Sequence, residues 1–438
     1  MAYAPRKRNY RIKWKIALPI ILLCALIIYV ASSVFFKSTE QKETFTVCGF
    51  TPEKTASVLN TKSADLVSVS DYVYYGESLG LYEQTYSPLN KDTLSGKSVL
   101  LHNVCDGSEI TMTLGDTADQ KIVLQDIKDG FYEVSIMDNL VKKRVVFKDK
   151  VEDNSFTTVP RDGVVHQVSI VADADLLADQ NIKMDQNYMF LNVTSKESTQ
   201  DQIDVLIDPY GMNVDIQNVP DKGNEANGLV ENDEMYEAAQ LMKKELESYG
   251  LRVEITKNGK DEVISTYGDE GRLAKGYQKH AKYYLFLRFN ANAVSTDSKG
   301  MEIWHSSYSS PTLARNIMYQ MAEVDKVVNP SALYYDDYDW QGIVSSNVVA
   351  GRLDNEQIYD INLQLRESGG RATLTGKYSE TSRDENKSFV NADGMMALEL
   401  DFGYITNSED AKNWKDNKEK IVRSCAKAFA LGINVINE

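Results

Sequence analysis

The chain changes its pattern once along its length, and this change constrains the fold more than any other feature. Over residues 71–195, short runs rich in β-branched and aromatic residues are separated by turn signals such as Asp106-Gly107, Asp129-Gly130 and Asp162-Gly163. Over residues 203–438, apolar strands alternate with amphipathic helices. A polar stretch separates the two regions. The sequence therefore predicts an all-β domain followed by an α/β domain.

The first of these regions contains eight candidate strands at regular spacing, which favours a β-sandwich of immunoglobulin-like or jelly-roll type. The runs span residues 98–104, 109–114, 121–127, 131–137, 143–148, 155–159, 166–172 and 188–193. His102 and His166 are isolated within these runs. Because a metal site needs several ligands together, we interpret both histidines as structural.

The second region predicts a mostly parallel sheet with right-handed crossovers. Its first strand, from Ile203, ends at Asp208-Pro209, because proline cannot donate to a β-ladder. The loop beyond the carboxyl end of such a strand is where a site is expected. Further strands are predicted at 251–255, 283–289, 301–304 and 397–404, and helices at 234–249, 271–282, 312–324 and 408–434.

The N-terminus predicts a membrane anchor. Residues 16–36 form an almost uninterrupted apolar run, which as a helix spans roughly 31 Å. Basic residues crowd residues 1–15 but not the other flank, so the positive-inside rule places this tail in the cytoplasm. A cleaved signal peptide is the alternative, but the run is long for one and Ala31-Ser32-Ser33 is a weak cleavage site. Residues 37–70 are then a stem, and the rest of the chain is extracytoplasmic.

Charge and cysteine content narrow the function classes. The net charge of −16 argues against nucleic-acid binding, since no basic surface is evident to meet phosphates. Cys48 and Cys105 both fall outside the membrane, where a disulfide can form, and their pairing is left open. Cys425 lies in a helical pattern and is expected to be a buried thiol.

Five segments of residues 203–438, taken in order, resemble the zinc-dependent N-acetylmuramoyl-L-alanine amidases of amidase family 3, which cleave peptidoglycan. They are Asp208-Pro209-Tyr210-Gly211-Met212-Asn213, Gly228-Leu229-Val230-Glu231-Asn232-Asp233, Arg288-Phe289-Asn290-Ala291-Asn292, Gly300-Met301-Glu302-Ile303-Trp304 and Leu400-Asp401-Phe402-Gly403-Tyr404-Ile405-Thr406-Asn407. Each lies on the strand or helix where the family has its motif. The resemblance implies an amidase-like fold and an association with the bacterial cell wall.

The resemblance also implies a zinc site, and here the sequence departs from the family. The family binds zinc through two histidines and a glutamate, and uses another glutamate as general base or acid. Gly211 and Asn290 stand at the histidine positions, so Glu231 is the only retained metal ligand. Asp401 stands at the catalytic glutamate position and is one methylene shorter. We therefore expect no bound cofactor and a metal position at Glu231 without its ion.

Two other ligand sets remain open. His280 or His305 would have to move in to restore zinc, although neither follows a strand that lines the family's site. Alternatively, oxygen ligands would suit Ca²⁺ or Mg²⁺. The binding candidates at this site are Asp208, Glu231, Asn290 and Asn292, with Asp401 at the catalytic position. The same residue types also satisfy backbone groups in ordinary loops.

Three functions are compatible with these features. The first is a membrane-anchored pseudo-amidase that binds peptidoglycan or a cell-envelope protein. The second is an active amidase with an atypical metal site, and the third is a structural component of an envelope complex. An acidic aromatic cluster at 334–340 is a further candidate for contact with sugars or a partner.

Overall fold

The computed structural model describes residues 48–84, 94, 97–113, 122–125, 127–151, 156–198, 202–214, 219–266, 270–305, 311–332, 340–345 and 395–437. The expected membrane helix at 16–36 and most of the aromatic cluster at 334–340 lie outside these residues. Within the described ranges, no helix combines the length and apolarity needed to cross a membrane. The chain divides into two compact units, Met1–Thr46 and Val47–Glu438.

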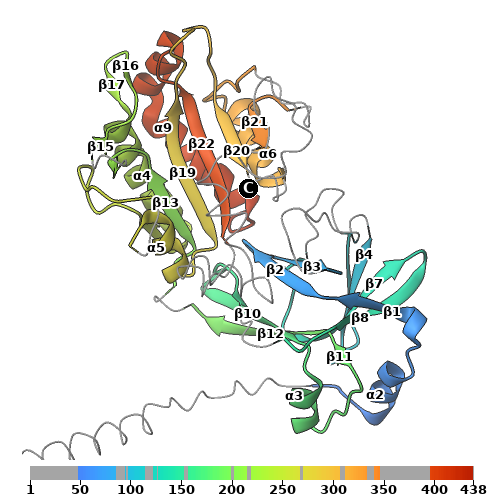
Figure 1. Cartoon of the computed structure of the whole chain (residues 1–438). Coiled ribbons are helices and arrows are strands. Elements are labelled where there is room, and N and C mark those ends of the chain that lie inside the picture. The colour runs from blue at the N-terminus through green and yellow to red at the C-terminus, as the bar shows by residue number, and fades with distance from the viewer. Residues whose placement is uncertain are drawn as a thin grey trace, which may run out of the picture. The chain divides into compact units, whose positions relative to one another are not determined.

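The β-rich part of the larger unit contains twelve strands among its described residues (Figure 1). The strands are β1 (Leu66–Val69), β2 (Asp71–Tyr75), β3 (Ser78–Tyr82), β4 (Ser98–Asn103), β5 (Glu109–Thr113), β6 (Ile122–Val123), β7 (Gly130–Asp138), β8 (Val141–Phe147), β9 (Phe156–Thr157), β10 (Val164–Val171), β11 (Asn187–Tyr188) and β12 (Phe190–Glu197). The helices are α2 (Pro52–Leu59), the 3-10 turn η1 (Ser63–Asp65) and α3 (Ala174–Asp179).

These strands form a nine-stranded sheet, ordered β1-β8-β7-β12-β10-β9 with β4, β5 and β11 alongside, and a three-stranded sheet β2-β3-β6. Tyr74 and Leu79 of the smaller sheet share one buried core with Val134 and Val168 of the larger. The nine-stranded sheet starts within the expected stem, because β1 pairs in parallel with β8. A sandwich of immunoglobulin-like or jelly-roll type stays a prediction.

A disulfide links the start of the β-rich part to its sheet. Cys48 and Cys105 are bonded, and their Cα atoms lie 4.8 Å apart. The adjoining helix α2 begins with Thr51 as its N-cap, whose side chain accepts a hydrogen bond from the amide of Lys54. The structure thus shows that the two cysteines pair, a question that the sequence left open.

The α/β part follows the predicted alternation closely. Its strands are β13 (Val205–Pro209), β14 (Asn213–Val214), β15 (Pro220–Asp221), β16 (Glu225–Ala226), β17 (Leu229–Val230), β18 (Val253–Ile255), β19 (Tyr283–Asn290), β20 (Glu302–His305), β21 (Ile343–Ser345) and β22 (Met396–Tyr404). Its helices are α4 (Glu231–Ser248), α5 (Arg272–Gln278), α6 (Thr312–Tyr319), the π-helical turn η2 (Gln320–Val324) and α9 (Ser408–Gly432).

The main sheet has six strands in the order β18-β13-β19-β22-β20-β21. Neighbours pair in parallel except β20 with β22, which are antiparallel. The prediction of an α/β domain with a mostly parallel sheet is confirmed. Pairing of β13 with β19 ends at Pro209, as expected for a residue without an amide hydrogen.

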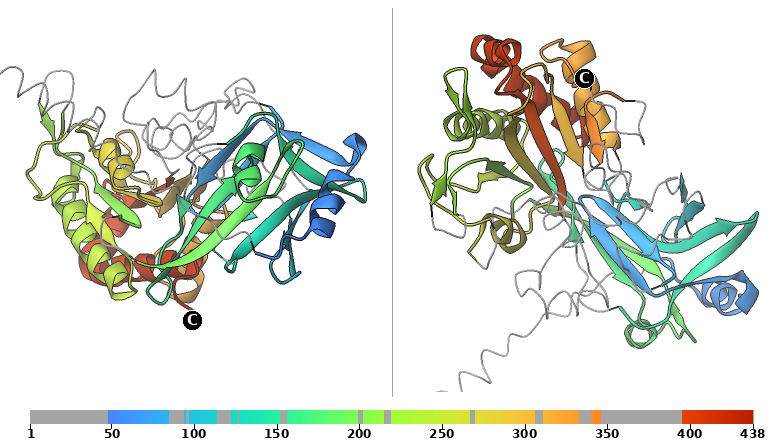
Figure 2. Two further views of the ribbon diagram at one scale, coloured as in Figure 1. Left: turned by 90° about the horizontal axis from the view of Figure 1, so that it is seen from below. Right: turned by 45° about the horizontal axis from the view of Figure 1, so that its top comes forward.

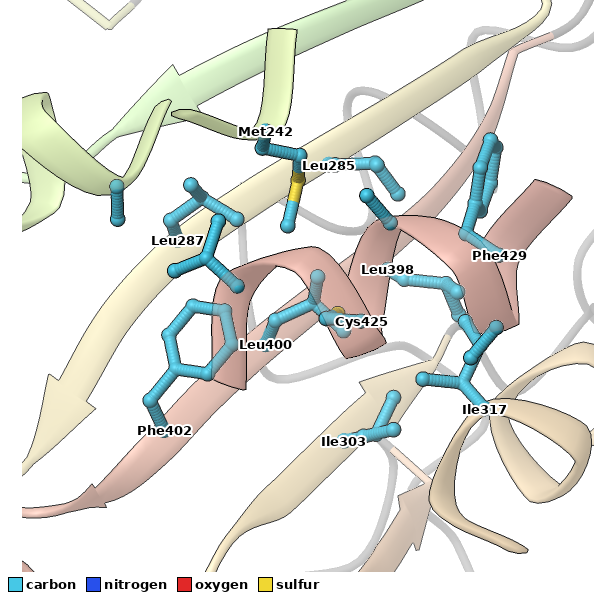
Figure 3. Packing of buried hydrophobic residues seen from close by; sticks show 14 of the residues in the cluster. Met242, Leu285, Leu287, Ile303, Ile317, Leu398, Leu400, Phe402, Cys425 and Phe429 are labelled. Atoms are coloured by element: carbon cyan, nitrogen blue, oxygen red, sulfur yellow. The ribbon is translucent and has the colours of Figure 1, made fainter. Parts of the chain in front are cut away.

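The two faces of this sheet are covered differently. Helices α4, α6 and α9 pack on one face, where α4 and α9 run side by side (Figures 1 and 2). Leu287, Ile303 and Leu400 point into this core toward Cys425 and its neighbours on α9 (Figure 3). The predicted burial of Cys425 is confirmed, and burial raises the pKa of its thiol to about 12. On the opposite face, α5 covers apolar side chains of β13, β19 and β22.

The carboxylate of Glu77 lies where the β-rich part contacts the α/β part within the larger unit. Arg161 donates to Glu77 at 2.9 and 3.0 Å, and also to the backbone carbonyl of Ile433 at 2.7 Å. The hydroxyl of Tyr283 donates to the same glutamate at 3.0 Å. Glu77 is 5% exposed, so this carboxylate is neutralised by groups from both parts of the chain.

Candidate functional site

A row of charged side chains crosses three neighbouring strands of the α/β sheet. Arg288 of β19 lies opposite Asp401 of β22, which in turn lies opposite Glu302 of β20. Residues next to each of them point into the helix-covered core, so the alternation of a strand puts the row on the opposite face. Glu399, two residues before Asp401, joins the same face. The strand register thus places Glu302, Glu399 and Asp401 on the same sheet face as Arg288.

Arg288 is the centre of this group. Its Nη1 atom lies 3.4 Å from Oε1 of Glu399, and its Nε atom 3.6 Å from Oδ1 of Asp401. The guanidinium also sits 5.0 Å from the ring centroid of Tyr210. Burial lowers the pKa of Arg288, but the charges of Glu399, Asp401 and Glu231 outweigh it and raise the pKa above its ordinary value. The arginine is therefore a permanent cation at this site.

Asp401, the predicted catalytic position, lies beside this cation but is not held by a hydrogen bond. Its Oδ1 atom and Nε of Arg288 have no hydrogen-bond partner among the described residues, and the 3.6 Å between them is too long for one. The side chain is 3% exposed. Burial, followed by the charge of Glu399, raises the pKa of Asp401 well above its ordinary value, while Arg288 opposes the shift. A proton on this carboxyl is thus favoured by its surroundings.

Glu231, the predicted metal ligand, is the first residue of α4 and is fully buried. Its Oε1 atom accepts a hydrogen bond from the amide of Phe289 at 2.8 Å. Its Oε2 atom accepts from the amide and the side chain of Asn224, both at 2.8 Å. Burial raises the pKa of Glu231, against these hydrogen bonds and the charge of Arg288. The side chain ties the start of α4 to the end of β19.

Asn290 and Asn292, the other candidates at the end of β19, form hydrogen bonds with neighbouring side chains and amides. Asn290 donates to Oε2 of Glu302 at 2.9 Å and accepts from the amide of Ala291 at 2.9 Å. Asn292 accepts from the amides of Val294 and Ser295 and so shapes the following turn. The structure brings Asn290 to the Arg288 group through Glu302, and gives Asn292 a role in its own loop.

Asp208 belongs to a separate network. It is fully buried and accepts hydrogen bonds from Arg272 at 3.0 Å and from Thr256 at 2.7 Å, with Tyr284 as a third donor. Arg272 also donates to the carbonyl oxygen of Pro209 at 3.0 Å. Asp208 therefore lies on the same sheet face as Asp401, but an ion pair with Arg272 of α5 holds its side chain in a network of its own.

The loop after β13 has no room for a ligand side chain at the first histidine position. Gly211 has φ of 99°, and an added Cβ would lie 2.5 Å from Cβ and Oδ1 of Asn232. That amide oxygen accepts from the ammonium of Lys257 at 2.8 Å, and the same ammonium donates to the carbonyl of Gly211 at 3.1 Å. Burial, followed by the charge of Arg272, lowers the pKa of Lys257 to about 8. Asn232, held by the buried amine of Lys257, therefore occupies the space that a side chain at position 211 would need.

Sequence reasoning named the segment containing Glu302 but gave that residue no role. Glu302 is 1% exposed and accepts from Tyr404 at 2.8 Å, Trp304 at 3.2 Å and Asn290 at 2.9 Å. Burial raises its pKa, against these hydrogen bonds. The sequence did carry a signal for this residue, because Glu302 stands between two apolar residues in a predicted strand. A buried carboxylate in such a position needs hydrogen-bond partners.

Neither alternative histidine reaches the group. His305 is buried on β20, but it alternates with Trp304 and so points to the helix-covered face. His280 follows α5 and precedes β19, at the opposite end of that strand from Arg288. Restoration of zinc by either histidine is not compatible with these positions.

The described residues do not fit the family's zinc ion. Among them, no three His, Cys, Asp or Glu side chains are arranged to hold a metal. Gly211 cannot donate, Asn232 and Lys257 fill the space beside it, and Arg288 already lies among the carboxylates. A carboxamide such as that of Asn290 is a poor zinc ligand beside imidazole. No reaction step through a metal follows from this arrangement.

Comparison with known families gives one match, covering half of the chain. The sequence model described as N-acetylmuramoyl-L-alanine amidase matches residues 217–435. The matched range contains Glu231, Asn290, Glu302 and Asp401, and begins after the loop of Gly211. No protein of curated function matches the chain.

Several solved structures are similar to about half of the chain. The N-acetylmuramoyl-L-alanine amidase AmiC2 of Nostoc punctiforme shares 18% identity at a TM-score of 0.34, over 54% of this chain and 97% of that one. The amidase Ami1 from Mycobacterium smegmatis shares 14% identity at a TM-score of 0.35, over 54% of this chain and 97% of that one. The CwlD amidase from Clostridioides difficile, solved in complex with the GerS lipoprotein, shares 13% identity at a TM-score of 0.34, over 53% of this chain and 97% of that one.

Proposed function

The chain belongs to the N-acetylmuramoyl-L-alanine amidase family, and from this premise we propose that it binds peptidoglycan at the family's site without cleaving it. One observation carries the proposal. The guanidinium of Arg288 lies among the carboxylates of Glu399, Asp401 and Glu231, where the family would hold a metal near Glu231. Zinc hydrolysis needs a seated ion whose bound water is activated, and a fixed cation of this kind supplies no such water.

Binding is supported by the side chains at the edge of this group. Tyr210, Arg288, Asn290 and Trp304 are each partly exposed, whereas the carboxylates beneath them are buried. Tyrosine and tryptophan present apolar faces with a polar tip, which suits contact with sugar rings and peptide. Trp304 lies opposite Glu399 in the sheet, so it shares the face of Arg288. These groups form a surface of mixed aromatic and polar character at the family's site.

The proposed location is the outer face of a cell membrane, with the chain held there by residues 16–36. The basic residues of 1–15 support a cytoplasmic N-terminus. The disulfide between Cys48 and Cys105 supports an oxidising compartment for the rest of the chain, because cytosolic thiols stay reduced. The substrate polymer of the family lies in that compartment.

Sedimentation with purified peptidoglycan sacculi tests the proposal. The full chain in mild detergent is expected to pellet with sacculi, and Trp304→Ala to lower the bound fraction about tenfold, as loss of an aromatic contact predicts. Tyr319→Ala is the control, since Tyr319 is 52% exposed and lies on α6, which packs on the opposite face of the sheet. Both variants are first checked for an unchanged unfolding temperature.

Two results would contradict the binding proposal. One is a wild-type chain that stays in the supernatant with sacculi. The other is equal retention of Trp304→Ala and Tyr319→Ala, which would place binding elsewhere on the molecule. In either case, a cell-envelope protein becomes the better candidate for the partner.

A further inference from the structure

We infer that the β-rich part is an intramolecular stabilising partner of the α/β part. The two are coupled through one interface at the amino-terminal end of the α/β sheet, so that breaking this interface lowers the stability of both. The inference goes beyond the proposed binding of peptidoglycan and holds whether or not the chain binds a polymer. It gives the β-rich part a role that the sequence did not indicate.

The interface lies at the end of the sheet opposite the family's site. The β-rich part contributes the turn between β2 and β3 and the segment that begins with β9, and the α/β part contributes the starts of β19 and β22 and the end of α9. Tyr283 opens β19, and Arg288 lies five positions later, about 17 Å along the strand. A change in this interface therefore does not touch the site directly.

The polar centre of the interface is Glu77, whose carboxylate accepts hydrogen bonds from both parts. Within the β-rich part, the amide of Val159 donates at 3.0 Å and the guanidinium of Arg161 at 2.9 and 3.0 Å. From the α/β part, the hydroxyl of Tyr283 donates at 3.0 Å. Burial and the charge of Glu77 raise the pKa of Tyr283 well above its ordinary value, so this hydroxyl keeps its proton. Because a buried carboxylate needs its donors, the loss of one from either part destabilises the shared contact.

Arg161 extends the contact to the last helix of the α/β part. Its Nη2 atom donates to the carbonyl oxygen of Ile433 at 2.7 Å, and its Nε atom donates to that of Asn434 at 3.2 Å. Carbonyl groups at the carboxyl end of a helix lack partners within the helix, and a cation is favourable there. The β-rich part thus supplies a side chain that caps α9.

Apolar contacts surround these hydrogen bonds. Val159 is fully buried and belongs to the core cluster of the α/β part, together with Met396 at the start of β22. The turn between β2 and β3 lies so close that a Cβ added at Gly76 would be 3.0 Å from Cβ of Met396. The buried ammonium of Lys282 lies 3.7 Å from the ring centroid of Phe156, which is a cation–π contact. Separating the two parts would expose these groups to water.

A hinge between the two parts is the alternative, because polar interfaces within a chain commonly allow such motion. With a hinge, the stability of each part is independent of the other. With coupling, an interface residue of one part also stabilises the other part. The two cases therefore differ in where along the chain a single substitution increases hydrogen exchange.

The first test compares Arg161→Ala with Arg144→Ala in the full chain in mild detergent. Arg144 is the matched control, because its side chain is 21% exposed against 22% for Arg161 and it also pairs with a glutamate, Glu133, but inside the β-rich part. Hydrogen exchange of the backbone amides is followed by mass spectrometry. The measurement covers β7 and β12 in one part and β19 and β22 in the other.

Arg161→Ala should raise the opening equilibrium of the most protected amides at least tenfold in both parts, as loss of hydrogen bonds to a charged group predicts. Arg144→Ala should change the α/β part far less than the β-rich part, because its partner lies within the latter.

A second pair of variants measures the coupling in the reverse direction. Tyr283→Phe removes the hydroxyl that bonds to Glu77 in the β-rich part, whereas Tyr249→Phe removes one that bonds to Glu245 within the α/β part. Tyr283→Phe should increase exchange in β7 and β12, and Tyr249→Phe should not. Tyr283→Phe is also the milder change, so it decides the question if Arg161→Ala does not fold.

Two outcomes would overturn the inference. One is an Arg161→Ala variant in which exchange in β19 and β22 rises no more than in Arg144→Ala. The other is a Tyr283→Phe variant that leaves β7 and β12 as protected as Tyr249→Phe does. Neither outcome depends on sedimentation with sacculi, so this inference and the binding proposal fail separately.

Discussion

At the scale of single residues, two aspartates of the same sheet face have opposite roles. Asp208 pairs with Arg272 and accepts further hydrogen bonds from Thr256 and Tyr284. Asp401 is equally buried, but its Oδ1 atom receives no hydrogen bond from the described residues. The role of each aspartate therefore depends on the hydrogen-bond donors that the fold places beside it.

We therefore expect Asp401→Asn and Asp208→Asn to differ in the free energy of unfolding. Asp208→Asn breaks a buried ion pair and should cost about 3 kcal/mol. Asp401→Asn removes a charge that burial and Glu399 disfavour, so it should cost less than about 1 kcal/mol or stabilise. Chemical denaturation of both variants at neutral pH measures the difference. Similar losses in the two would show that Asp401 is an essential partner of Arg288.

The buried amine of Lys257 predicts a pH dependence of stability. Its pKa falls from 10.5 to about 8 on folding, because of burial and the charge of Arg272. Between these values the unfolded chain holds a proton that the folded chain has lost, so stability rises with pH; below about pH 8 both states are protonated and the slope vanishes. Relative to Lys257→Met, the wild type should gain about 3 kcal/mol from pH 8 to 10.5. A constant difference between the two proteins over that range would refute the assignment.

The sequence alone identified Glu231, Asn290 and Asp401 through the order of their motifs, and the structure brings all three to the Arg288 group. It could not reveal that group itself. Arg288 and Asp401 are 113 positions apart, and only the register of β19 against β22 makes them neighbours. The ion pair of Asp208 was not foreseen for a similar reason, since its partner Arg272 lies on another element, α5.

At the scale of elements, the long strands and helices follow the hydrophobic pattern, whereas the short ones do not. The strands β13, β19, β20 and β22 and the helix α9 lie within a few residues of their predicted bounds. The two-residue strands β14 to β17 were not predicted, because a pattern of period two cannot be detected over two residues. The missed strands β2 and β3 form a separate small sheet with β6.

The loop between β13 and α4 gives a prediction about the lost ligand position. Gly211→Ala places a Cβ 2.5 Å from Asn232 in addition to imposing a strained φ of 99°. Gly107→Ala is the control, because Gly107 has φ of 80° and nothing within 4 Å of the added atom. We expect Gly107→Ala to cost about 1 kcal/mol and Gly211→Ala at least about 2 kcal/mol more. Equal losses in thermal unfolding would mean that Asn232 moves aside easily and that a histidine could be accommodated here.

At the scale of the whole molecule, hydrogen bonds from Arg161 to the carbonyl of Ile433 and from Tyr283 to Glu77 join the β-rich and α/β parts. The proposed membrane topology, in contrast, rests on the N-terminal sequence alone.

Protease treatment of intact spheroplasts checks that topology. With the N-terminus inside, protease added outside should reach the chain beyond residue 37 and leave only a short N-terminal fragment protected. An antibody against the first fifteen residues detects this fragment, and lysed cells serve as the control for its digestion. Full protection of the α/β part in intact spheroplasts, with digestion after lysis, would reverse the orientation.

The central claim is that this member of the amidase family recognises peptidoglycan without hydrolysing it. The most direct measurement is the release of stem peptides from purified peptidoglycan by the full chain with zinc supplied, followed by mass spectrometry of the soluble fraction. We expect no release above buffer, since the residues around Glu231 and Arg288 do not offer the ligand set for a water-activating ion. Stem peptides released by the wild type and abolished in Glu231→Gln would contradict it.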